Sequence, residues 1–214
     1  YPALGNHDTN YNGTLFNIKE MYSTFFSNTH NVVPNFASNG MDYYKDFEDL
    51  KVRLVVINSN YENVYRYSMT TIEWMRTVLD IDYTVIFAEH DSLIKTENFN
   101  NQYTAYADDL KSVIDDFKQR NGKLIHLCGH SHADYSFSSP YLTVFSNCAK
   151  FEKADLTNVG YTVISGYDSK GLVAPDRNAD DYTKLSWSVL VIKPFSRKVK
   201  FVRFGSGEDR EYAY

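Results

Sequence analysis

The 214-residue chain lacks the features of several protein classes. Its two cysteines, Cys128 and Cys148, form no C-x-x-C pair and are too few for a disulfide framework. No apolar run approaches the roughly 20 residues that span a bilayer, so we expect no membrane partner. The formal net charge is -5 and no stripe of lysine or arginine occurs. A basic nucleic-acid-binding surface is therefore not expected.

The composition is that of a globular protein. Hydrophobic residues make up 43% and charged residues 23% of the chain, close to globular averages, and the length suits one core. We therefore expect a single domain over residues 1–214. The 18 tyrosines favour packing residues half-buried in sheets over a surface that stacks ligands.

Helical and strand patterns alternate through the middle of the chain. Helical spacing predicts helices, and runs of branched apolar residues predict strands that are covered on both faces. The predicted strands are 41–47, 52–58, 83–88, 123–128, 133–137, 141–147 and 161–165, and the predicted helices are 14–26, 70–80 and 104–120. This order predicts an α/β layered sandwich of mixed sheets flanked by helices.

The chain is expected to end in a β-hairpin. Alternation predicts that Trp187, Val189 and Val191 point inward, and that Val199 and Phe201 follow on the second strand. Upstream, a capping box beginning at Thr70 is expected to start the second helix.

Four of the six histidines lie just beyond predicted strands: His7, His90, His130 and His132. In layered α/β folds ligands bind at the carboxyl ends of strands, so different strands can bring these side chains together. His126, in contrast, lies within an apolar strand, where a hydrogen-bonded core histidine is the better interpretation. Cys128 is expected to be a buried free thiol.

Three short motifs contain these histidines. Gly5-Asn6-His7-Asp8 supplies an amide oxygen, an imidazole and a carboxylate; Glu89-His90-Asp91 adds an imidazole; Gly129-His130-Ser131-His132 adds two more. Imidazole nitrogens with amide and carboxylate oxygens suit Mn, Fe or Zn better than Ca or Mg. The motifs therefore predict a metal site.

Taken in order, the motifs resemble those of the calcineurin-like metallophosphoesterases. The resemblance implies a dinuclear centre that hydrolyses phosphomonoesters or phosphodiesters. It implies that Asn6, His90 and His130 bind the second metal and that His132 binds the first. It further implies that His7 contacts phosphate and protonates the leaving group, and that Asp8 orients His7.

Two motifs of that family, D-x-H and G-D-x-x-D, do not occur in this chain. Because the family carries both before G-N-H-D, we expect a domain whose first strands and first-metal ligands precede residue 1. Two divalent ions are then expected in the intact protein and one or none in this chain, which we expect to be catalytically incomplete. An open sheet edge is expected to favour homo-oligomers.

Two alternatives remain open. In the first, the chain is a non-catalytic metal-binding structural or interaction protein, for example of a phage virion. This alternative is motivated by the tail from Phe204 to Glu211, which resembles that of phage and prophage members of the family. Alternatively, it is a single-metal hydrolase of a non-phosphate ester. The substrate, the identity of the metal and the cellular compartment are not determined by the sequence.

Overall fold

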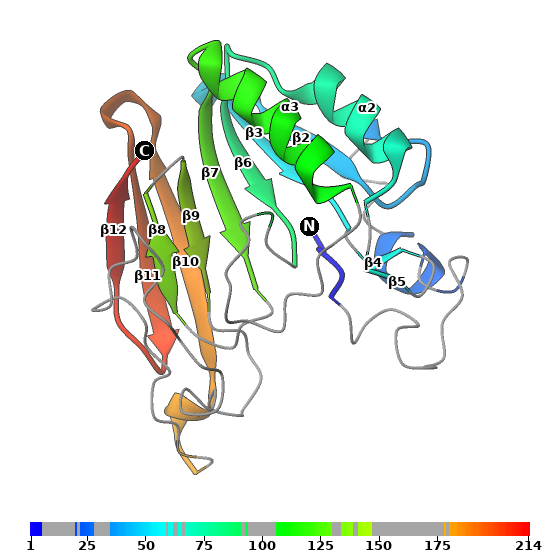
Figure 1. Cartoon of the computed structure of the whole chain (residues 1–214). Coiled ribbons are helices and arrows are strands. Elements are labelled where there is room, and N and C mark those ends of the chain that lie inside the picture. Colours follow the sequence, from blue (N-terminus) through cyan, green and yellow to red (C-terminus); the bar gives the residue numbers. More distant parts are fainter. Residues whose placement is uncertain are drawn as a thin grey trace. The chain divides into compact units, whose positions relative to one another are not determined.

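The computed structural model is α/β, with a large mixed sheet of seven strands and a second sheet of three strands (Figure 1). It describes residues 1–5, 20, 22–27, 35–58, 60–61, 64–65, 67–90, 93, 106–129, 134–138, 141–146, 178 and 180–214. The predicted α/β class with mixed sheets is confirmed at this level. The described chain forms two compact units, one up to Leu124 and one from Ile125 onward.

The first unit contains strands β1 (Asn35–Phe36), β2 (Tyr43–Phe47), β3 (Val52–Val56) and β6 (Thr84–Ala88). Strand β2 pairs antiparallel with both β1 and β3, whereas β3 and β6 are parallel. Branched apolar residues make β3 and β6 nearly continuous in buried side chains, as expected for strands covered on both faces. The predictions for 52–58 and 83–88 are confirmed. A separate pair of short strands, β4 (Asn60–Tyr61) and β5 (Val64–Tyr65), follows β3.

Two helices lie side by side over the strands of this unit: α2 (Met69–Val78) and α3 (Ala107–Gln119) (Figure 1). The apolar face of α3 is buried, as its spacing predicts. The predicted capping box at Thr70 is wrong, because Ser68 caps α2 by accepting a hydrogen bond of 3.0 Å from the Thr71 N–H. In the predicted helix 14–26, the described end is a π-helical turn, Tyr22–Phe26.

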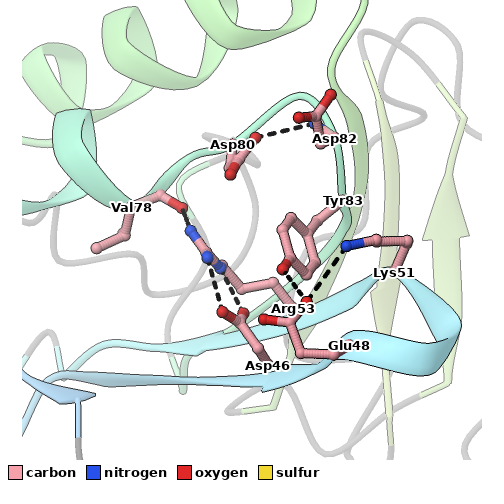
Figure 2. A network of polar contacts seen from close by, with 8 residues as sticks. All are labelled: Asp46, Glu48, Lys51, Arg53, Val78, Asp80, Asp82 and Tyr83. Carbon is pink, nitrogen blue, oxygen red and sulfur yellow. Dashed lines mark hydrogen bonds and ion pairs between the residues drawn. The ribbon is translucent and has the colours of Figure 1, made fainter.

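A polar network fastens the amino-terminal ends of β3 and β6 (Figure 2). Arg53 donates two hydrogen bonds to Asp46, of 2.6 and 2.8 Å, and a third of 2.6 Å to the Val78 carbonyl oxygen. Glu48 accepts from the Tyr83 hydroxyl and from Lys51. A two-pronged bond between guanidinium and carboxylate is geometrically specific, so this network fixes the turn between β2 and β3 against α2.

The second unit packs two sheets face to face. Strand β7 (Lys123–Cys128) runs into it and pairs in parallel with β9 (Leu142–Phe145), and β8 (Tyr135–Phe137) pairs antiparallel with β9. Strands β10 (Ser186–Lys193), β11 (Lys198–Gly205) and β12 (Arg210–Ala213) form the three-stranded sheet. The core between the two sheets contains Ile125, Leu142, Val144, Val199 and Phe201.

The hairpin β10–β11 is where predicted, but the predicted inward face of β10 is wrong. Trp187, Val189 and Val191 are 48%, 49% and 39% exposed, and the alternate residues of β10 face the core instead. On β11, Val199 and Phe201 are buried as predicted. Because cross-strand partners share a face, Val199 and Phe201 bring their partners Ile192 and Leu190 inward.

Other predictions have mixed outcomes. Strand β12 was not predicted, and the predicted strand 161–165 lies outside the described residues. The single domain, the segment before residue 1 and the homo-oligomer stay predictions. No helix in the described ranges is both long enough and apolar enough to cross a membrane.

Candidate metal and phosphate site

The carboxyl ends of two parallel strands form the candidate site of the first unit. Strand β3 leads into Ile57 and Asn58, and β6 leads into Glu89 and His90. Since parallel neighbours finish at the same sheet edge, this edge is the expected ligand-binding edge. His90 is half-buried there.

Glu89, the residue before His90, is a buried and hydrogen-bonded carboxylate. The residue is 4% exposed, and its carboxylate accepts hydrogen bonds from the Tyr67 hydroxyl and, at 3.1 Å, from the Leu93 N–H. A buried carboxylate needs such donors, since an unpaired one carries a large desolvation cost. Both hydrogen bonds therefore hold the side chain of Glu89, the residue immediately before His90.

The first residues of the chain are anchored at the same edge. Leu4 is buried in a cluster with Phe26, Met41, Tyr43 and Val56. The Leu4 N–H donates to Asn58 Oδ1 at 2.8 Å, and the Tyr43 hydroxyl donates to the Pro2 carbonyl oxygen at 2.9 Å. Side-chain burial and two long-range hydrogen bonds therefore fix the segment that leads into the first motif.

Gly5, the first residue of that motif, lies directly against the His90 ring. A Cβ atom at position 5 would lie 2.7 Å from His90 Cε1 and 2.8 Å from its Nδ1. Real Cβ atoms essentially never approach so closely, so any other residue at position 5 would require the His90 ring to shift. Two motifs far apart in sequence, Gly5-Asn6-His7-Asp8 and Glu89-His90-Asp91, thus begin at one place.

A buried carboxylate, that of Asp42, is hydrogen-bonded to Asn58 at this edge of the sheet. Asp42 is fully buried and accepts from the Asn58 N–H at 2.9 Å, from Asn39 Nδ2 at 2.7 Å and from the Thr71 hydroxyl at 2.6 Å. Burial raises the pKa of the Asp42 carboxyl above its usual value of 3.8, against the hydrogen bonds from Thr71, Asn39 and Asn58, which lower it. Through Asn58 the network reaches the Leu4 N–H.

The second unit contains the strand that carries the third motif. Strand β7 ends at Cys128, and Gly129 follows. As predicted, Cys128 is buried and is in no disulfide within the described residues, and His126 is a core histidine. The Cys128 sulfur lies 3.2 Å from His126 Nε2, and His126 Nδ1 lies 3.2 Å from the Thr143 hydroxyl.

Among the six predicted site residues, the structure describes His90 alone. Asn6, His7, Asp8, His130 and His132 lie outside the described residues. Gly5, which precedes Asn6, and Gly129, which precedes His130, are described, and Gly5 lies against the His90 ring. The predicted roles of the five other residues stay predictions.

Asp42 and Asn58 are supporting residues that the sequence analysis missed. Asn58 follows a run of apolar β3 residues, so a polar side chain at a strand end was the available signal. Nothing local marks Asp42, which lies sixteen residues before Asn58 in sequence and finds its partners only through folding. Glu89 was noted beside His90, without its Tyr67 partner.

No protein-family model matches the chain, and a search of curated proteins finds no match. Any family assignment therefore depends on the three motifs and on the placement of Gly5 and His90.

Proposed function

We propose that the chain carries part of the dinuclear centre of a calcineurin-like phosphoesterase, which hydrolyses phosphate monoesters or diesters. The observation that carries the proposal is the packing of Gly5 against the His90 ring. It brings the start of the G-N-H-D sequence to the histidine that follows β6. So close a contact between two motifs that lie far apart in sequence supports a shared site.

The donor types fit a pair of transition-metal ions. Asn6, His90 and His130 would hold one ion and His132 would contribute to the other. Imidazole nitrogen and amide oxygen are donors that Mn, Fe and Zn accept. The Glu89 carboxylate, next to His90 in the chain, is held by hydrogen bonds from Tyr67 and Leu93.

Bound metal ions would supply charge stabilisation at the phosphoryl oxygens and a hydroxide nucleophile at neutral pH. The chain's own residues complete the proposal. His7 protonates the departing oxygen, and Asp8 orients the His7 ring. Asp42 and Asn58 contribute indirectly. Asp42 holds Asn58, and Asn58 holds Leu4, the residue before the Gly5-Asn6-His7-Asp8 motif.

One observation favours a second candidate, a metal-binding interaction protein. The outer face of β10 and β11 exposes Trp187, Val189, Val191, Val202 and Phe204. Contiguous exposed apolar side chains often mark contact surfaces for other proteins. Bound metal without hydrolysis across a broad panel of esters would favour this second candidate.

The direct test is metal content per chain by inductively coupled plasma mass spectrometry after loading with Mn or Zn. We expect bound metal in the wild type, and loss in both His90→Ala and His130→Ala. His30→Ala is the matched control, because His30 has no predicted role and the same side chain is removed. Metal retained in both site variants, or lost equally in the control, would overturn the proposal.

Hydrolysis of bis(4-nitrophenyl) phosphate by the same samples provides the second readout. Under the proposal, any metal-dependent turnover disappears in His130→Ala and persists in His30→Ala. Turnover that is insensitive to His90→Ala and His130→Ala would place the reaction elsewhere in the protein.

A further inference from the structure

A cavity of ≈ 370 Å³ lies within the second unit, between its two packed sheets. Leu127 and Val144 line it from the large sheet, and Leu190 and Phe201 line it from the three-stranded sheet. It reaches Gly129, the residue immediately before His130. The cavity is thus an apolar space beside the start of the third motif.

Serine side chains gather in the same cavity wall. Ser146 follows the end of β9, and its N–H donates to the Cys128 carbonyl oxygen at 3.0 Å, which ties it to the end of β7. Ser186 and Ser188 face inward from the first half of β10. The polar groups therefore belong to the end of the cavity at which β7 and β9 finish.

A buried cationic cluster lies behind these serines. Arg210 donates to the Ser146 hydroxyl at 3.1 Å, and Arg203 donates to the Ser186 hydroxyl. Both guanidinium groups share one carboxylate, that of Asp134, at 2.6 Å from Arg203 and 3.2 Å from Arg210. Among the residues that the structure describes, these two guanidinium groups share one carboxylate, and the resulting formal excess of positive charge favours an anionic or oxygen-rich group at this end.

One hydroxyl in the wall lacks a partner. The Ser188 oxygen is buried, and within the described parts of the chain it makes no hydrogen bond. Buried polar atoms are nearly always paired, and an unpaired one costs stability. A ligand oxygen in the cavity would remove that cost.

We propose that this cavity binds the apolar group of an aromatic phosphate ester, with the ester oxygens at the serine end beside Gly129 and the ring between the sheets. A cavity of about 150 Å³ holds benzene, so the larger volume here accommodates a bicyclic ring. The inference rests on the proposed phosphoesterase function, because that function supplies the phosphate. It assigns the substrate class as esters with a large aromatic leaving group.

The test measures binding of 1-naphthyl phosphate, with inorganic phosphate as the polar-only probe, by isothermal titration calorimetry in a metal chelator. We expect 1-naphthyl phosphate to bind at least about tenfold more tightly than inorganic phosphate, since only the former fills the apolar space. Equal affinities for the two probes, or no binding of the naphthyl ester, would overturn the proposal.

Strand β10 offers a matched pair of variants. Leu190→Trp fills the cavity, whereas Val191→Trp places the same side chain on the exposed face. We expect Leu190→Trp to weaken naphthyl phosphate binding at least about tenfold and Val191→Trp to leave it unchanged. Equal affinities in the two variants would refute the assigned location.

Ser188→Ala is a second variant that tests the proposal even if Leu190→Trp fails to fold. We expect Ser188→Ala to bind 1-naphthyl phosphate more weakly than the wild type. We also expect a melting temperature at or above that of the wild type, because an unpaired buried hydroxyl is removed. Unchanged affinity in Ser188→Ala would contradict the role of this hydroxyl. Since no metal is present, failure of the phosphoesterase proposal, seen as absent metal binding, is distinguishable from failure of this one.

Discussion

Replacing Gly5 with alanine adds one methyl group at the point where two motifs meet. The new Cβ would lie 2.7 Å from His90 Cε1, whereas ordinary contacts begin at 3.4 Å. The His90 ring must therefore move by about 0.7 Å or rotate. Displacement of a functional group by about 1 Å can lower a reaction rate on the order of 100-fold. Loss of the contacts that orient a metal ligand typically lowers metal affinity about 10- to 100-fold.

We accordingly expect Gly5→Ala to bind Zn at least about tenfold more weakly than the wild type, measured by titration calorimetry against the apo protein. The matched control is Gly122→Ala, in which the added methyl group meets the buried Phe117 ring. Overpacking there should lower the free energy of unfolding by about 1–3 kcal/mol.

The two variants separate positioning from stability. Thermal unfolding should report a loss in both, but metal affinity should fall only in Gly5→Ala. Wild-type affinity in a folded Gly5→Ala variant would refute the reasoning, because it would show that the metal does not depend on where the His90 ring lies. Equal loss of affinity in Gly122→Ala would reduce the effect to general destabilisation.

Three further predictions follow from the polar networks. Asp42→Asn should lower the free energy of unfolding by about 2–4 kcal/mol, because an amide turns a donor toward neighbours that are themselves donors; an unchanged urea midpoint would contradict this. Arg53→Lys should cost about 1–3 kcal/mol in the same assay, since lysine cannot form the two-pronged bond to Asp46, and should leave metal affinity unchanged. The hydrogen bond from Tyr83 lowers the pKa of the Glu48 carboxyl below its usual 4.5. The ionised form therefore stabilises the fold above that pH, and the contribution is lost as the pH falls. Melting temperatures should thus fall more steeply in the wild type than in Glu48→Gln between about pH 5 and 3, and parallel curves would count against the assignment.

Helices and strands could be predicted from the sequence where a segment shows a single apolar pattern, either helical spacing or a continuous apolar run. Strand β7 has the bounds expected from its apolar run, and α3 buries the face that its spacing indicates. Both patterns depend on the period of the backbone itself, which is a local property. The cap of α2 was mispredicted because Ser68 and Thr70 are both suitable cap residues and lie two positions apart. Strand β12 was missed because it is short and depends on pairing with β11.

Local periodicity could not decide which face of β10 is buried. Trp187, Val189 and Val191 are the more apolar set, yet they face solvent, because pairing with β11 places Leu190 and Ile192 opposite the buried Phe201 and Val199. A two-residue period offers two equivalent faces, and only the partner strand chooses between them.

The sequence by itself determined which residue types stand at the strand ends, and with them the histidine, asparagine and aspartate chemistry of the candidate site. Only the tertiary structure decided that Gly5 lies against His90 and that Asp42 reaches Asn58. It also decided that Arg203 and Arg210 stand behind the serines of one cavity. Contacts between residues distant in sequence arise from packing and hydrogen-bond pairing after the chain has folded, and no local pattern encodes them.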